Sequence, residues 1–161
     1  MLIIMEGVVL CFILLIFCVI SIANGPEKFT VFYEKDVQDK AIKLGYTTKK
    51  DIKKQTIISV IVLYLPCFIL VPYMVCYING AKEFREIFYQ SLLIMYIMGL
   101  FDRFFVDWYW VEHTKAWNIP NTEELKPYIP KKMKIFKWLG TIVGFAIIAL
   151  IIALVMSYII L

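Results

Sequence analysis

One apolar stretch of the sequence carries several ionisable side chains at close spacing. Arg103 and Asp107 are four residues apart, which is the register for an ion pair on a helix. Asp102 is a second carboxylate in this stretch, and it is not part of that pair. At 100° per residue, Asp102 and Tyr109 fall within about 40° of one another, so we expect them to share a face. These residue types suit the binding of a small polar or ionic solute by Asp102, Arg103, Asp107 and Tyr109.

The end of the same stretch allows a second kind of chemistry. Asp107, Glu112 and His113 are residues that supply acid–base catalysis or metal ligands. A lysine group that could hold a phosphate headgroup follows in the next segment. One alternative is therefore a lipid-active membrane enzyme with these three catalytic candidates, and another is an accessory subunit without catalysis. The candidate headgroup ligands are Lys131, Lys132, Lys134 and Lys137.

The sequence predicts neither a metal nor a cofactor. The chain has one His, and neighbouring residues such as Glu112 and His113 diverge by about 100° on a helix. Their spacing matches no zinc-binding pattern. Glycine-rich phosphate loops are absent from the sequence, and so are CxxC motifs. The cysteines are expected to fill apolar space.

Composition decides where this chemistry takes place. The chain has 161 residues, of which 61% are hydrophobic and 19% charged, and its mean hydropathy is +0.77. Soluble domains carry about 25% charged residues. The excess of apolar residues excludes a water-soluble enzyme, a disordered chain and a disulfide-stapled secreted module. What remains is an integral membrane protein.

Four apolar stretches are long enough to cross a bilayer, which takes about 20 helical residues. We therefore predict an all-α integral membrane protein, one bundle over residues 1–161 with four transmembrane helices and a cytoplasmic amphipathic helix. Ionisable groups in hydrocarbon are costly and usually face a bundle interior. The third span should accordingly line a polar cavity. The predicted spans cover about 2–23, 56–78, 87–111 and 136–161.

Lysine placement predicts the orientation. Residues 24–55 carry eight Lys and residues 112–137 carry six, whereas residues 79–86 carry one Lys and one Arg. By the positive-inside rule the two Lys-rich loops are cytoplasmic, and both termini lie outside. The polar cavity then falls in the cytoplasmic half of the bundle. We expect a plasma-membrane location and contact with anionic inner-leaflet lipids, and we expect no nucleic-acid partner.

The first Lys-rich loop has a helical pattern. Apolar side chains recur at spacings of three and four, which predicts an amphipathic helix over about 26–44 with Gly45 as its stop. The helix either lies along the inner leaflet or packs on the end of the bundle. Thr48 and Asp51 form a capping-box pattern before the second span. The apolar positions are Phe29, Tyr33, Val37, Ala41 and Leu44.

Three further features leave two interpretations each. The segment 118–134 contains three prolines and is either a shaped lid or a stiff connector. Gly140 and Gly144 allow a close helix contact, either inside the bundle or in a homo-oligomer. Glu6 is the only charge in the first span and lies on the same side as Arg85 in this topology. It forms either an outer gate or an interfacial carboxyl that reaches water.

Overall fold

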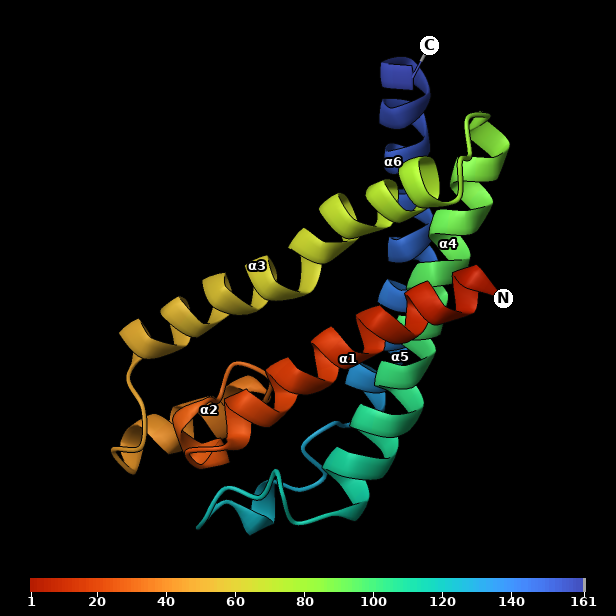
Figure 1. Ribbon diagram of the computed structural model, residues 1–161. Helices are drawn as coiled ribbons and strands as arrows, with labels where there is room; N and C mark the ends of the chain where they lie inside the picture. The colour runs from red at the N-terminus through yellow and green to blue at the C-terminus, as the bar shows by residue number, and fades with distance from the viewer. Residues whose placement is uncertain (161) are drawn as a thin grey trace.

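The computed structural model describes residues 1–160, and these residues form an all-helical bundle (Figure 1). Three of the long helices contain π-helical segments, in which backbone bonds join residues five apart. The helices are α1 (Leu2–Ile22), α2 (Lys35–Lys43), α3 (Lys49–Tyr73), α4 (Phe84–Phe101), α5 (Lys131–Leu139) and α6 (Phe145–Ile160). Their π-helical segments are Met74–Ile78 after α3, Asp102–Val111 after α4, and Gly140–Gly144 between α5 and α6. Short 3₁₀ turns lie at Pro26–Lys28 and Glu123–Leu125.

Three continuous helical stretches of residues 1–160 have the length and hydropathy needed to cross a membrane. The bundle is therefore compatible with an integral membrane protein. The predicted third span coincides with α4 and its π-helical continuation, but it is not one of the three, because ionisable side chains interrupt its apolar run. A fourth crossing stays a prediction. The three stretches are Leu2–Ile22, Lys49–Ile78 and Lys131–Ile160.

Helix α4 is the centre of the bundle. It packs along α6 on one side and is crossed by α1 on another (Figure 1). Ile94 and Met95 of α4 are fully buried, as is Leu10 of α1. Gly99 permits the closest approach, because an added Cβ there would lie 2.6 Å from Thr141 Cγ2. The cavity described below is built around this central helix.

The small residues of the last span divide into two groups. Ala149 and Ala153 are fully buried and contribute to the hydrophobic core of the bundle. A Cβ at Gly140 or Gly144 would meet no atom within 4 Å. The expectation of internal packing is therefore wrong for the two glycines, which face open space because the buried residues of this span are Thr141 between them and the alanines further along α6. A homo-oligomer contact through them stays a prediction.

The amphipathic helix predicted over residues 26–44 is shorter in the structure. Only Lys35–Lys43 is α-helical, with Val37 and Ala41 buried, and Gly45 follows it with a φ of 78°. Residues 29–34 form a turn instead, because their backbone and rings have other partners. The Thr30 amide donates to Gln55 Oε1 at 3.0 Å, and Phe29 packs edge-on against Phe17. The segment thus packs on the bundle.

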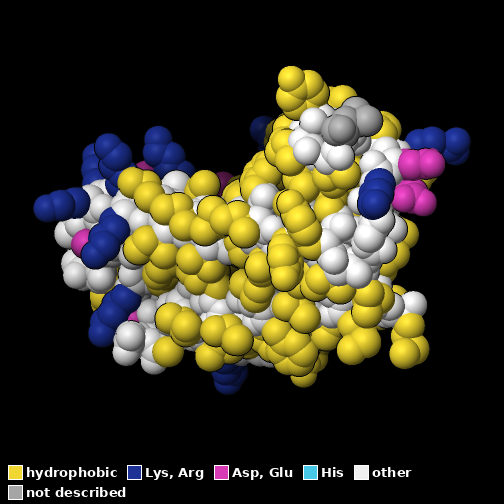
Figure 2. Space-filling model, turned by 45° about the horizontal axis from the view of Figure 1, so that its top comes forward, with side chains coloured by type: hydrophobic (Ala, Val, Ile, Leu, Met, Phe, Trp, Pro, Cys, Tyr) yellow, Lys and Arg dark blue, Asp and Glu magenta, His cyan; other side chains and the backbone are white. Residues whose placement is uncertain are grey.

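The surface is apolar between two charged ends. Figure 2 shows a broad hydrophobic area in the middle of this face, with Lys and Arg side chains gathered at the end where α3 begins. There the Asp51 amide donates to Thr48 Oγ1 at 3.2 Å, so the predicted cap is present. Exposed apolar side chains such as Ile57, Ile69 and Leu154 belong to the three long apolar stretches. This distribution suits a lipid-facing surface.

Candidate functional site

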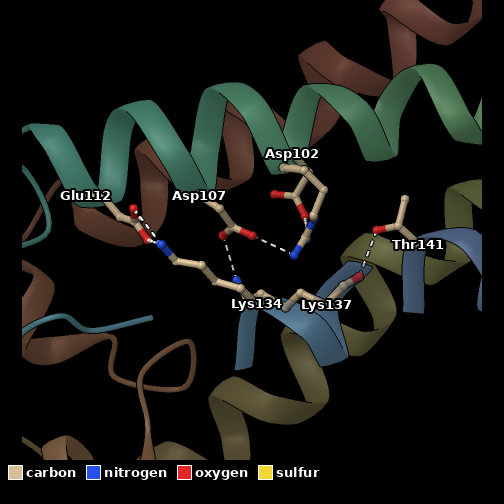
Figure 3. Close-up of polar contacts among 7 residues, drawn as sticks. Asp102, Asp107, Glu112, Lys134, Lys137 and Thr141 are labelled. Atoms are coloured by element: carbon tan, nitrogen blue, oxygen red, sulfur yellow. Dashed lines mark hydrogen bonds and ion pairs between the residues drawn. The ribbon is translucent and has the colours of Figure 1, made fainter. Parts of the chain in front are cut away.

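Three carboxylates of the polar stretch lie along one side of the helix. Asp102, Asp107 and Glu112 are five residues apart, and an α-helix would turn successive members about 140° away from one another. The π-helical segment Asp102–Val111 widens each turn, because its backbone bonds join residues five apart. The three side chains therefore point toward the neighbouring helix α5, as Figure 3 shows.

Each of these carboxylates meets a cation. Arg103 pairs with Asp102 and, through NH1, with Asp107 Oδ2 at 2.6 Å. The ion pair predicted from the i, i+4 spacing is thus present. Two lysines from α5 complete the set, with Nζ–carboxylate distances of 2.6 Å for both Lys137–Asp107 and Lys134–Glu112 (Figure 3). We call these six residues the charge ladder: Asp102, Arg103, Asp107, Glu112, Lys134 and Lys137.

Burial changes along the charge ladder. The Arg103 side chain is 9% exposed and that of Asp107 12%, whereas Lys134 is 42% exposed. Three carboxylates and three cations balance, so the cluster has no net formal charge. Buried ion pairs of this kind are tolerated only when every member has a partner. The ladder is therefore a polar wall that is buried at its Arg103–Asp107 end and open to solvent at its Lys134 end.

A cavity of about 330 Å³ adjoins the buried part of this wall. Its polar side is formed by Asp102, Arg103, Asp107 and Lys137. The remaining lining comes from α1, α3, α4, the α5–α6 segment and two loops, one between α1 and α2 and the other between the π-helical segment Asp102–Val111 and α5. The apolar lining includes Leu14, Leu63, Met98 and Phe145, and the loops add Phe32, Tyr33, Trp117, Tyr128 and Ile129. A cavity with one charged side and several apolar sides suits a small molecule that carries a polar group.

The two loops are joined to each other where they cover the cavity. Tyr33 donates its hydroxyl hydrogen to the Trp117 carbonyl at 2.6 Å. Burial raises the pKa of the Tyr33 phenol, and the neighbouring Tyr128 and Glu27 raise it further, so the hydroxyl stays a donor. The Tyr33 and Tyr128 rings meet edge-on with centroids 5.2 Å apart. The proline-containing segment thus covers the cavity as well as connecting two helices.

A second hollow of about 300 Å³ lies on the other side of the charge ladder. Arg103 and Asp107 line both spaces, so their ion pair is part of the wall between them. The other lining residues of the second hollow are Phe104, Trp108, Glu112, Lys134 and Trp138. The ladder is accordingly the element that separates the two spaces.

Two predicted site residues lie elsewhere. Tyr109 is 51% exposed and lines neither space, because the widened helical turn moves it off the side that carries Asp102. His113 is exposed, and its Nδ1 lies 2.5 Å from the Trp108 carbonyl oxygen. Since a carbonyl only accepts, Nδ1 carries the hydrogen of this bond. The structure thus brings together Asp107 and Glu112 but not His113.

The predicted headgroup lysines separate into two pairs. Lys134 and Lys137 are partners of the charge ladder. Lys131 and Lys132 are exposed and form no ion pair with the residues that the structure describes. Only the second pair is free to meet an anionic group outside the chain.

No group of three or more His, Cys, Asp or Glu side chains among residues 1–160 is arranged to hold a metal ion. The four cysteines, Cys11, Cys18, Cys67 and Cys76, are buried free thiols.

The spacing of the ladder's carboxylates is visible in the sequence. A regular α-helix, however, would place them on different sides, so the spacing alone did not predict the ladder. The carboxylates recur at a spacing of five, and Lys134 and Lys137 are three apart on a facing helix. The parts contributed by the loops have no comparable signal, because Tyr33 and Trp117 are 84 residues apart.

The chain matches no family model, no curated protein and no solved structure.

Proposed function

We propose that this chain is a polytopic membrane protein that binds or translocates a small polar or ionic solute. The observation that carries the proposal is the cavity of about 330 Å³ whose one polar side is the buried part of the charge ladder. Asp102, Arg103 and Asp107 are the proposed contacts, as the sequence suggested. Lys137 joins them, because it lines the same cavity.

Asp102 is the residue most able to exchange its partner for a solute. Its side chain is 25% exposed, compared with 9% for Arg103, and its cation is shared with Asp107. A solute group that replaced part of this pairing would regain the hydrogen bonds that it lost from water. The apolar sides of the cavity would enclose the rest of the molecule.

The ladder also supports a fourth membrane crossing by α4 and its continuation. An unpaired charge in hydrocarbon is expensive, but charges that face a bundle interior and pair with one another are tolerated. The charges in residues 102–111 are paired, and α4 lies between α1 and α6. Four crossings agree with the lysine distribution of the sequence, in which both Lys-rich loops are cytoplasmic and both termini are outside. We also propose a plasma-membrane location.

The other two interpretations have less support. An enzyme acting on a phosphate headgroup would need Asp107, Glu112 and His113 to act together. The two carboxylates are neutralised by lysines, and His113 bonds the Trp108 carbonyl instead. An accessory subunit would need no cavity. In the experiment below, phospholipid turnover would support the enzyme, and the absence of any ligand response would leave the accessory subunit.

A ligand panel on purified protein in detergent tests the proposal. The panel contains zwitterionic amino acids, small monocarboxylates and organic ammonium salts, and thermal unfolding is the readout. A ligand at 100 times its Kd stabilises by about 2.7 kcal/mol, which raises the Tm of a chain of this size by roughly 5–10 °C. Asp102→Asn keeps the side-chain shape and removes the charge, so we expect it to lose most of the shift.

Asp51→Asn is the matched control, because Asp51 is exposed at the start of α3 and far from the cavity in the fold. It should keep the full shift. The proposal fails if no ligand class raises the Tm of the wild type, or if Asp102→Asn and Asp51→Asn respond alike. Turnover of defined phospholipids that is lost in His113→Ala would support the enzyme instead.

A further inference from the structure

A second polar cluster lies at the opposite end of α4 from the charge ladder. Glu6 of α1 is 6% exposed and lies beside Asn79 of the turn before α4. Asn79 Nδ2 donates to Glu6 Oε2 at 3.0 Å and to Gln90 Oε1 at 3.0 Å. Gln90 is six residues into α4, about 9 Å of helix rise from its start.

The hydrogen-bond inventory of this cluster leaves one donor missing. An asparagine amide has two N–H hydrogens, and Asn79 uses both, which fixes its Nδ2 toward Glu6 and Gln90. Two buried acceptors then remain without a donor, Glu6 Oε1 and Asn79 Oδ1. They belong to side chains that are already bonded to each other. A single additional hydrogen between them would satisfy both.

No cation compensates Glu6 in the part of the chain that the structure describes. The five ion pairs of residues 1–160 involve other carboxylates, and Arg85, which the predicted topology puts on the same side, forms no ion pair with Glu6. A bare carboxylate at this burial is strongly unfavourable. The ionisable groups in and around the turn and at the start of α1 are Tyr77, Lys82, Glu83, Arg85, Glu86, Tyr89 and the Met1 amino group, and none of them bonds Glu6.

We propose that Glu6, Asn79 and Gln90 form a proton-binding site, in which Glu6 is a neutral acid that donates from Oε1 to Asn79 Oδ1. With the Nδ2–Oε2 bond, this donation closes an acid–amide pair joined by two hydrogen bonds. A proton fits where a larger occupant does not, because a water-sized sphere reaches neither oxygen. A metal cation would need room and several more oxygen ligands.

The position of the site gives the proton a structural consequence. Next to Glu6, Gly7 packs directly against Ile97, with 2.7 Å between an added Cβ and the Ile97 Cβ. Loss of the proton would leave an uncompensated charge at this tight α1–α4 contact. Helix α1 also lines the cavity through Leu14 and Cys18. The protonation state of Glu6 therefore acts on a helix that bounds the charge ladder's cavity.

Infrared spectroscopy of the protein in lipid vesicles at pH 7 tests the site directly. We expect the wild type to show the carbonyl stretching band of an un-ionised carboxylic acid, and the difference spectrum against Glu6→Gln to contain that band. Glu83→Gln is the matched control, because Glu83 is an exposed carboxylate on the adjacent turn. An absent difference band for Glu6→Gln overturns the proposal, and so does an equal loss in Glu83→Gln.

Thermal unfolding in detergent provides a second, independent readout. The amide of Glu6→Gln supplies the hydrogen that the neutral acid supplies, so its Tm at neutral pH should stay within roughly 2 °C of the wild type. Where the folded state binds more protons than the unfolded state, stability falls as pH rises. The wild-type Tm should therefore fall relative to that of Glu6→Gln in alkaline buffer. Parallel pH curves, or a Tm raised by sodium but not by potassium, overturn the proposal.

Discussion

Helix α4 and its continuation meet buried carboxylates at both ends, and the two ends treat them differently. The charge ladder gives each of its three carboxylates a cationic partner. The Glu6 cluster gives its carboxylate only amide partners from Asn79, with Gln90 beside it. A buried carboxylate is thus accommodated either by a counterion or, as we infer for Glu6, by a proton. The choice depends on which side chains the neighbouring helices bring within reach.

The backbone of α4 explains why the ladder can take the first solution. Its π-helical continuation aligns carboxylates five residues apart, and α5 presents Lys134 and Lys137 to that side. At the other end the backbone is an ordinary α-helix, and neither Lys82 of the turn nor Arg85 of α4 forms an ion pair with Glu6. Several aligned charges of opposite sign can compensate one another in a network. An isolated buried carboxylate has no counterion within reach, and a proton then has to neutralise it.

Removing Arg103, the central cation of the charge ladder, should have the largest effect on the free energy of unfolding. Asp102 would then be a buried carboxylate without a counterion, as Glu6 would be without its proton. Arg103→Met leaves Asp102 without a partner and Asp107 with Lys137 alone. Breaking a buried pair from one side costs about 3–5 kcal/mol. We expect a loss of this size in the free energy of unfolding in detergent. The exposed and unpaired Lys131→Met should change it by less than about 0.5 kcal/mol.

A triple variant separates the charge of the ladder from its packing. Arg103→Met with Asp102→Asn and Asp107→Asn removes both carboxylates together with the cation that they share, and leaves only Lys137, which is 27% exposed to solvent, without its partner. Replacing a whole buried pair is often close to neutral, so this variant should recover much of the stability that Arg103→Met alone loses. A triple variant as unstable as the single one would show that Arg103 stabilises the bundle through its packing.

A second, smaller effect should come from the glycines that hold α4 against its neighbours in each region. Gly99→Ala places a Cβ 2.6 Å from Thr141 Cγ2 beside the ladder, and Gly7→Ala places one 2.7 Å from Ile97 beside Glu6. Such overpacking costs about 1–3 kcal/mol, measured by unfolding. Gly144→Ala meets open space and should change stability by about 0.5 kcal/mol or less. A similar loss in all three variants would mean that the glycines act only through backbone flexibility.

The two regions differ in how far the sequence predicted them. Composition and apolar length predicted a helical bundle, and the spacing of Arg103 and Asp107 predicted their ion pair. The side occupied by Tyr109 was not predictable, because it depends on a π-helical segment that a constant 100° per residue excludes. The partner of Glu6 depended on which residue near the turn reaches α1, and the sequence indicated Arg85 as a possible neighbour but gave no sign of Asn79. The sequence predicted pairs of residues within one helix, whereas it did not predict contacts between segments that are far apart in the chain.

The smallest predicted effect concerns the gradient of burial within the ladder. Lys134 is 42% exposed where it meets Glu112, and Lys137 is 27% exposed where it meets Asp107. Water screens the first pair more, so Lys134→Met should cost less than about 1 kcal/mol in unfolding free energy. Lys137→Met should cost more, because Asp107 is the more buried carboxylate, although Arg103 still compensates it. Equal losses would show that solvent exposure does not set the strength of these pairs, and that the ladder acts as one network along its whole length.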